Sequence, residues 1–304
     1  MITVDQAKKA LTGPIASVST PFNKDGSIDF VSLRNIVDFI IEAGSGTVLL
    51  TYGDSLYSIL TDSEIAEITK VVIDQTAGRA MTVVAGSWWM GESIRFAQFA
   101  RDIGADMYMP LPPDWAQSGS ATNFVEFYTR ISEVLPVMMV TMIGSRPIPK
   151  ETIEVLLEQE NNIIALKDDK CGEYGKEIAG LIDGRWAFLS GGRKYNHFDI
   201  MNYGVDGYLS VYMRFMPEIA HKYWTAVQNN NLETATNIIN TYDVPFMVDL
   251  PLELNLNFDA LIHGAMEIFK VAKRWRRNPY TSASNEQMII IRAFFEKLKL
   301  LQKI

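Results

Sequence analysis

The stretch Ile163-Ile164-Ala165-Leu166-Lys167-Asp168-Asp169 decides the fold, because four apolar residues run directly into a charged tip. Such a run is typical of a parallel strand that is covered on both faces, where the alternation of apolar and polar residues disappears. Seven other segments are likewise rich in Val, Ile, Leu, Met or Tyr and stop near Gly, Pro or a polar residue. They are Ala16–Phe22, Gly46–Gly53, Met81–Ser87, Asp106–Pro113, Val137–Gly144, Trp186–Gly192 and Gly207–Arg214.

Helical patterns lie between these segments. Asp29 is a good N-cap for an apolar stripe that begins at Leu33. Thr61 and Glu64 have the spacing of a capping box, and Gly104 suits the left-handed end of another helix. Strand, helix, strand, eight times over, predicts an α/β fold of the (β/α)8 TIM-barrel type across residues 1–230. An open doubly wound sheet is the alternative, but no Gly-x-Gly-x-x-Gly follows the first strand and no Walker loop occurs.

The chain after the eighth segment predicts a C-terminal helical extension at residues 231–304. The apolar patterns indicate helices at Pro217–Gln228, Leu232–Tyr242, Asp259–Arg277 and Ser284–Leu301. The basic run Lys273, Arg274, Arg276 and Arg277 falls at the end of the third of these. A solvated helix end that complements its own dipole explains this run better than a nucleic-acid site.

Composition narrows the class of protein. The chain has 304 residues, 48% of them hydrophobic, which is enough for a large core without disulfides. A net charge of -8 argues against a nucleic-acid partner, because neutralising phosphates needs a basic face. Cys171 is the only cysteine, and the apolar runs are too short to span a bilayer. We therefore expect a cytoplasmic protein without a membrane partner.

Lys167 is the first candidate for chemistry, because active sites of such barrels lie at the carboxyl ends of the strands. An amine at the end of a buried strand loses its charge more readily than one in water. A neutral amine can attack a ketone and form an iminium, which withdraws electrons from the neighbouring carbon. The alternative is a structural lysine that pairs with Asp168 or Asp169.

Four segments, taken in order, resemble one known family. They are Val18-Ser19-Thr20-Pro21-Phe22 with Asp25-Gly26-Ser27-Ile28-Asp29, then Ile163-Ile164-Ala165-Leu166-Lys167-Asp168, Leu189-Ser190-Gly191, and Gly204-Val205-Asp206-Gly207-Tyr208-Leu209-Ser210-Val211. From Gly13 to the C-terminus the chain resembles the dihydrodipicolinate synthase and N-acetylneuraminate lyase family of pyruvate-dependent class I aldolases. The resemblance implies a Schiff base between Lys167 and a 2-oxo acid, no cofactor, and a homotetramer or dimer.

The sequence departs from the family pattern at positions that bind the substrate carboxylate or transfer protons in the family. Leu50-Thr51-Tyr52-Gly53-Asp54 stands where the family has Gly-Thr-Thr-Gly-Glu, so the second threonine is Tyr52. Val140 stands where the family has the tyrosine that shuttles protons beside the lysine, and valine cannot transfer a proton. Pro112-Pro113-Asp114-Trp115 replaces Pro-Pro-Tyr-Tyr, again without a phenol.

We therefore predict a Schiff-base lyase, of aldolase or dehydratase type, acting on a 2-oxo acid such as pyruvate or a keto-sugar acid. Lys167, Thr51 and Tyr52 are the predicted catalytic residues, with Tyr52 supplying the missing phenol. The predicted substrate-binding residues, among them arginines for a distal anionic group, are Arg146, Thr141, Gly191, Arg193, Leu209, Arg214 and Trp115.

Two alternatives stand beside this prediction. The first is a catalytically degenerate relative that binds an anionic small molecule without efficient turnover. The second is a metal-dependent aldolase, but His197, His221 and His263 all fall on predicted helices or loops beyond the strand tips. Asp54 and Asp114 are candidate general bases, for which a place on the surface is the commoner outcome.

Overall fold

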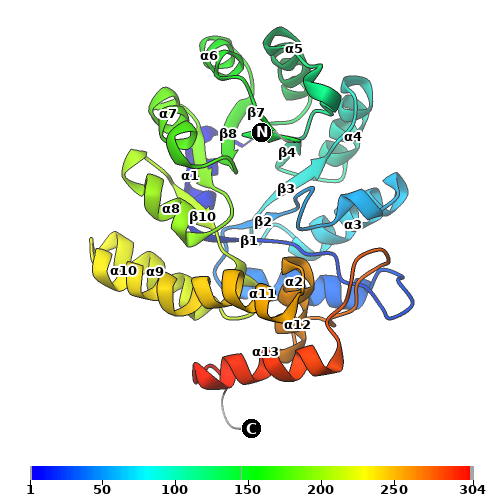
Figure 1. Cartoon of the computed structure of the whole chain (residues 1–304). Coiled ribbons are helices and arrows are strands. Elements are labelled where there is room, and N and C mark those ends of the chain that lie inside the picture. The colour runs from blue at the N-terminus through cyan, green and yellow to red at the C-terminus, as the bar shows by residue number, and fades with distance from the viewer. Residues whose placement is uncertain (1, 145, 302–304) are drawn as a thin grey trace.

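Eight parallel strands close into a barrel in the computed structural model, which describes residues 2–144 and 146–301 (Figure 1). This confirms the predicted (β/α)8 TIM barrel. The barrel strands are β1 (Gly13–Ser17), β2 (Thr47–Leu49), β3 (Met81–Gly86), β4 (Met107–Pro110), β5 (Val137–Val140), β8 (Ile163–Asp168), β9 (Ala187–Ser190) and β10 (Gly207–Leu209). The short antiparallel pair β6 (Met142–Ile143) and β7 (Arg146–Pro147) lies outside the barrel.

Helices alternate with the strands as the apolar spacing predicts. They are α1 (Val4–Leu11), α2 (Phe30–Glu42), α3 (Asp62–Thr76), α4 (Met90–Asp102), α5 (Ala121–Ser132), α6 (Lys150–Glu158), α7 (Gly172–Ile182), α8 (Lys194–Ile200) and α9 (Pro217–Gln228). The predicted start signals are confirmed: Asp29 caps α2, and Thr61 and Glu64 form a capping box on α3. Gly104, after α4, has a φ of 94°, which suits glycine.

Helix α1 covers the amino-terminal end of the barrel. It packs against β8 and β9, and Lys8 Nζ donates to the carbonyl of Gly184, 2.5 Å away, shortly before β9 begins. Gly207, the first residue of β10, is required here, because a Cβ atom would lie 2.0 Å from the Leu11 carbonyl oxygen. The opposite end, where the strands finish, is therefore the end that can open to a ligand.

All eight barrel strands end earlier in the structure than predicted, the first and the eighth by the most. The first ends at Ser17 rather than Phe22, because the chain from Val18 leaves the barrel ladder after one hydrogen bond to Leu49 O. The eighth ends at Leu209, and the rest of its apolar run forms the buried 3-10 turn η4 (Val211–Arg214). A short apolar run cannot distinguish a buried strand from a buried helical turn by periodicity alone.

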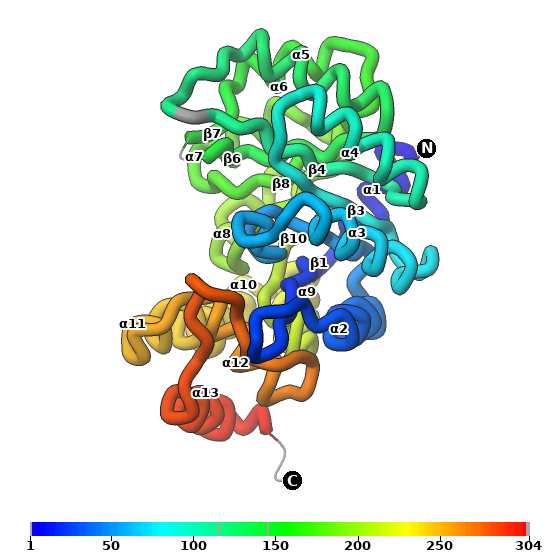
Figure 2. Tube along the Cα trace, turned by 90° about the vertical axis from the view of Figure 1, so that its right-hand side faces the viewer, coloured from blue at the N-terminus to red at the C-terminus, as the bar shows by residue number. Residues whose placement is uncertain are grey.

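The C-terminal helices gather on one side of the barrel beside α2 and α9 (Figures 1 and 2). They are α10 (Leu232–Ile238), the π-helical turns η5 (Ile239–Asp243) and η6 (Pro245–Asp249), α11 (Leu250–Leu254), α12 (Phe258–Ile268) and α13 (Asn285–Lys297). None of the helices in the described ranges combines the length and apolar character needed to cross a bilayer.

The prediction of one long helix over Asp259–Arg277 is wrong. Helix α12 ends at Ile268, and the chain turns at Lys270, whose φ is 62°. The basic run that follows is not a solvated helix end. The Arg276 side chain is buried and donates both to the Asp259 carboxylate, at 2.6 and 3.1 Å, and to Thr20 O. These bonds fasten the segment onto the loop after β1.

Candidate active site

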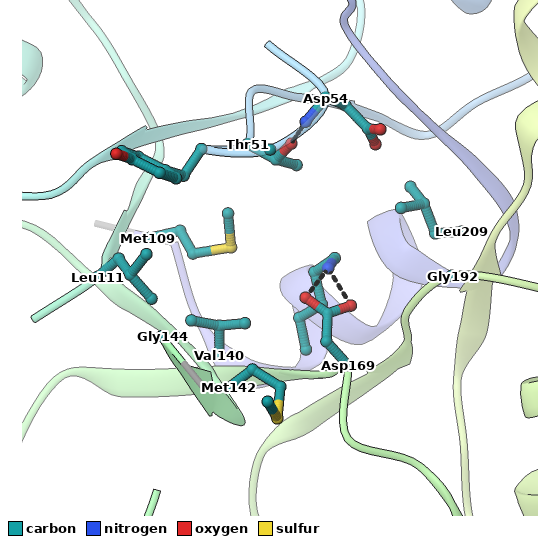
Figure 3. A pocket seen from close by; sticks show the side chains of 13 residues that line it. Thr51, Asp54, Met109, Leu111, Val140, Met142, Gly144, Asp169, Gly192 and Leu209 are labelled. Carbon is teal, nitrogen blue, oxygen red and sulfur yellow. Dashed lines mark hydrogen bonds and ion pairs between the residues drawn. The ribbon is translucent and has the colours of Figure 1, made fainter. Parts of the chain in front are cut away.

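A cavity of about 480 Å³ opens at the carboxyl ends of the strands (Figure 3). Its polar lining comes from the loop after β2 and from the tip of β8, and its apolar lining from β4, β5, β6 and β10. The lining residues are Thr51, Tyr52, Gly53, Asp54, Met109, Leu111, Val140, Met142, Gly144, Lys167, Asp169, Gly192 and Leu209. The predicted residues Lys167, Thr51, Tyr52 and Leu209 therefore share one cavity.

The Lys167 amine lies inside this cavity and contacts Asp169. The lysine is only 5% exposed, and its Nζ hydrogen-bonds to both carboxylate oxygens of Asp169, as the dashed lines in Figure 3 mark. Side chains alternate in direction along a strand, so residues 167 and 169 point the same way while Asp168 points the other way. Of the two acids left open by the sequence, Asp169 is the one that pairs with the lysine.

Thr141 organises the turn that follows Lys167. Its hydroxyl donates to Asp168 Oδ1 at 2.8 Å and accepts the backbone N–H of Asp169 at 2.8 Å. The Lys170 N–H also points at this hydroxyl, at 3.0 Å, and at Asp168 Oδ1, at 3.0 Å. Thr141 thus lies behind the cavity wall, buried, and holds the backbone that presents Lys167 and Asp169.

Gly191 leaves the space that Asp169 occupies. Its N–H donates to the Asp168 carbonyl at 2.8 Å, and a Cβ atom on it would lie 1.8 Å from Asp169 Oδ1. Only glycine fits beside the carboxylate in this position. The neighbouring Gly192 lines the cavity itself.

Arg214 and Asp54 form a second charged pair at the cavity wall. Arg214, 3% exposed, donates to Asp54 Oδ2 at 2.7 Å and to Ser19 Oγ at 3.0 Å. The Ser17 hydroxyl donates to the same Asp54 oxygen at 2.6 Å. Burial opposes ionisation of Asp54, but the Arg214 guanidinium and the Ser17 hydroxyl outweigh it and hold the pKa of this carboxyl below its ordinary value.

The loop after β2, which lines the cavity, has two backbone donors without an acceptor among the described residues. The Thr51 hydroxyl accepts the N–H of Asp54 at 3.0 Å, and Ser55 N–H donates to the Thr51 carbonyl at 3.2 Å. Within residues 2–144 and 146–301, the N–H groups of Tyr52 and Gly53 meet no acceptor. Successive free N–H groups in such a turn form a concave site for an anion.

Three predicted substrate-binding residues, Arg146, Arg193 and Trp115, are not among the residues that line the cavity in the described structure. Arg146 donates to Asp114 Oδ2 at 2.6 Å and to Gly119 O at 2.8 Å, away from the cavity lining. Arg193 is exposed at the start of α8 and does not line the cavity either. The side chain of Trp115 lies outside the described part of the structure.

Val140 faces the lysine, as the resemblance implies for the residue in the tyrosine position. It pairs with Lys167 in the β5–β8 register and lines the cavity. Tyr52, the phenol in the cavity lining, is 37% exposed, and its ring meets that of Tyr57 edge to face at 6.5 Å. The side chain opposite Lys167 on β5 therefore offers methyl groups where the family has a hydroxyl.

Neither the three histidines nor Cys171 is among the described residues that line the cavity. His197 is buried and bonded to Tyr223 Oη at 2.9 Å, and burial lowers its pKa to about 4. Burial, reinforced by Asp168 and Asp169, raises the pKa of the Cys171 thiol to about 12. Across the described residues, no group of three His, Cys, Asp or Glu side chains is placed to hold a metal ion.

Several lining residues have no counterpart among the predicted site residues. Asp169 could have been found from the two-residue period of the strand, which puts it on the side of Lys167. The sequence offers Asp54 only as a general base or a surface carboxylate, because its pairing with Arg214 joins segments 160 residues apart. The apolar residues Met109, Leu111 and Met142 carry no sequence signal that separates them from ordinary core.

Comparisons with known proteins agree with this architecture. The sequence model described as the Dihydrodipicolinate synthetase family matches residues 10–297. A 4-hydroxy-tetrahydrodipicolinate synthase from Chlorobium phaeovibrioides is 28% identical over 285 residues, which are 91% of this chain and 93% of that protein.

Two solved structures illustrate how far the fold is shared. An N-acetylneuraminate lyase from Fusobacterium nucleatum superposes with a TM-score of 0.83 at 16% identity, covering 95% of this chain and 99% of that one. A dihydrodipicolinate synthase from Acinetobacter baumannii, solved in complex with pyruvate, has a TM-score of 0.81 at 21% identity, covering 96% and 100%. At such identities these two structures bear on the fold alone.

Proposed function

The chain belongs to the Dihydrodipicolinate synthetase family, and from that premise we propose that it is a Schiff-base-forming lyase acting on a 2-oxo acid such as pyruvate or a keto-sugar acid. Members of this family are pyruvate-dependent Schiff-base lyases. The observation that supports the proposal most directly is the buried amine of Lys167 at the end of β8, opening on the cavity. Such an amine is placed to attack a ketone, and the iminium then acts as the electron sink.

The carboxylate of the 2-oxo acid fits the loop after β2. The free N–H groups of Tyr52 and Gly53, with the Thr51 hydroxyl beside them, supply donors for an anion. In this arrangement the keto carbon faces Lys167 while the carboxylate is held on the other side of the cavity. Tyr52 is the proposed phenol of the altered proton relay, because it is the tyrosine in the described cavity lining.

The alternative is a degenerate relative that binds an anionic small molecule without efficient turnover. Val140 beside Lys167 favours it, because general acid–base help is typically worth ~100–10,000-fold in rate and this position offers none. The two proposals share the cavity and differ in whether a bound 2-oxo acid is converted.

Borohydride trapping tests the proposed chemistry. The full-length protein is incubated with pyruvate and sodium borohydride, and the covalent adduct is mapped by peptide mass spectrometry. We expect a reduced adduct on Lys167, its loss in Lys167→Arg, and its retention in the matched control Lys170→Arg, whose lysine is exposed nearby. An adduct spread over surface lysines, or none on Lys167, contradicts the proposal. Steady-state kinetics with the 2-oxo acids that form this adduct then distinguish the lyase, which converts them, from the degenerate binder, which does not.

The homotetramer or dimer and the cytoplasmic location expected from the sequence stay predictions. Light scattering on the purified protein checks the first of them.

A further inference from the structure

We infer that Asp169 is the acid–base residue of the imine-forming step, moving protons between the Lys167 nitrogen and the oxygen of the bound ketone. The inference rests on the proposed function and adds a catalytic residue to it. It begins from contact: the Asp169 carboxylate touches the reacting nitrogen through both oxygens, and both residues line the cavity (Figure 3).

The surroundings fix Asp169 in that contact. Its backbone N–H is bonded to the Thr141 hydroxyl at 2.8 Å, and the bare Cα of Gly191 leaves room for Oδ1. The Asp169 side chain is 32% exposed, whereas that of Lys167 is 6% exposed. The carboxylate is therefore more accessible than the amine that it contacts, and both can meet a ligand in the cavity.

The other proton-exchanging groups in the described lining are less suited to this step. Asp54 is bound by Arg214 and by the Ser17 hydroxyl, and these partners keep it ionised. Val140 has no exchangeable proton, and it occupies the position opposite Lys167 on β5. Tyr52 comes from the loop after β2, where the substrate carboxylate is proposed to bind.

The step balances with Asp169 as the carrier. The carboxylate takes one proton from the lysine ammonium, and the neutral amine attacks the keto carbon, forming the C–N bond while the carbonyl electrons move to oxygen. Asp169 gives its proton to that oxygen and takes a second one from nitrogen, which yields the carbinolamine. It then protonates the hydroxyl, which leaves as water while the nitrogen lone pair forms the C=N bond. The products are the iminium, water and the Asp169 carboxylate.

The Asp169→Asn variant separates this role from simple ion pairing. Asparagine keeps the size of the side chain but cannot accept a proton. If Asp169 only held the ammonium, its loss would free the amine and pyruvate adducts would form on Lys167 as fast as in the wild type or faster. If it carries protons, the rate of trappable adduct formation at neutral pH falls about 100-fold or more.

The experiment is quenched-flow trapping with pyruvate and borohydride across pH, on the wild type and Asp169→Asn. We expect Asp169→Asn to be slow at each pH tested, and added formate to restore part of the rate in Asp169→Ala. Asp74→Asn is the matched control, because it removes the acid of an exposed pair with Lys70. Thermal unfolding checks that each variant is folded.

The outcomes distinguish the two proposals. A wild type that forms no adduct on Lys167 overturns the proposed function, and this inference with it. A wild type that forms the adduct, with Asp169→Asn equally fast or faster, overturns the role of Asp169 and leaves the Schiff base intact. Formate that restores nothing in a folded, slow Asp169→Ala also counts against proton transfer.

Discussion

Nη2 of Arg214 lies 2.7 Å from Oδ2 of Asp54, so a charged pair is built into the wall of the cavity. Arg214 is nearly fully buried, while the Asp54 side chain is 28% exposed and lines the cavity. Asp54 thus pairs with the Arg214 guanidinium, which the sequence predicts to bind an anionic group of the substrate. Lys167 is the cationic residue among the described residues that line the cavity.

Asp54→Asn is expected to destabilise the protein. Removing one charge of a buried ion pair leaves the other uncompensated, and here the Arg214 guanidinium would face a neutral amide beside the hydroxyls of Ser17 and Ser19. We expect the free energy of unfolding to fall by about 3 kcal/mol, measured by urea denaturation. Asp74→Asn, in an exposed pair, should cost less than about 1 kcal/mol. Equal losses in the two variants would contradict a structural role for the pair.

Gly191→Ala is expected to slow imine formation without unfolding the barrel. The new Cβ would lie 1.8 Å from Asp169 Oδ1 and 2.8 Å from the Asp168 carbonyl oxygen, so the turn must shift and the carboxylate must leave its place beside the Lys167 amine. The measurement is the rate of borohydride-trappable adduct on Lys167 with pyruvate. Gly180→Ala is the control, since a Cβ there meets nothing within 4 Å. A variant with normal trapping rates would show that the contact with Asp169 is dispensable.

Tyr52→Phe tests the altered proton relay. If the phenol carries a proton after the iminium has formed, turnover of a converted 2-oxo acid falls ~100-fold or more while trapping at Lys167 persists. The two readouts are steady-state kinetics and adduct yield on the same preparation. Tyr203→Phe, at an exposed tyrosine on η3 (Met201–Tyr203), is the control. Unchanged turnover in Tyr52→Phe would exclude Tyr52 as the proton donor.

Glu64→Gln gives a pH-dependent loss of stability. Two hydrogen bonds from Arg277, at 2.7 and 2.9 Å, are the main cause that lowers the Glu64 pKa from 4.5 to about 2. A lowered folded-state pKa stabilises the protein above the unfolded value, and that contribution is lost as pH falls from 4.5 toward 2. Because the pair is partly exposed, we expect the variant to be about 1 kcal/mol less stable at pH 7.

Urea denaturation at several pH values gives the free energies of unfolding of the wild type and of Glu64→Gln. The gap between wild type and Glu64→Gln should shrink through the acidic range. Glutamine still supports the capping box with Thr61, so the substitution removes mainly the charge. A gap that does not change with pH would contradict the ion-pair explanation.

The barrel could be predicted because its strands and helices carry local signals. The run Ile163–Leu166 reads as a buried strand, and the Asp29 cap and the Thr61–Glu64 box fix where two helices begin. The end of α12 could not be read in this way, because the apolar spacing continues past Ile268 although the chain turns there. The segment after the turn makes tertiary bonds, such as that of Arg276 with Thr20 O, which a local pattern does not reveal.

The site was predictable to the extent that it lies at strand ends. Lys167 is predicted by its place at the end of a strand and Thr51 by the family resemblance, and both line one cavity. The partners of the arginines could not be found, because Arg214 with Asp54 and Arg146 with Asp114 join loops that are remote in sequence. The residue types alone therefore predict a positively charged cavity entrance, whereas the folded chain pairs the guanidinium groups of Arg214 and Arg146 with acids.

The Thr141 hydroxyl ties the reactivity of this protein to its architecture. Since it is bonded to the Asp168 carboxylate and to the backbone N–H of Asp169, the amine and its neighbouring acid are oriented when the chain folds, before any ligand arrives. An incoming molecule then loses its own freedom of motion but does not have to order the protein. Substitution of this one threonine should therefore disturb both the packing of the turn and, in the proposed lyase, the orientation of the amine.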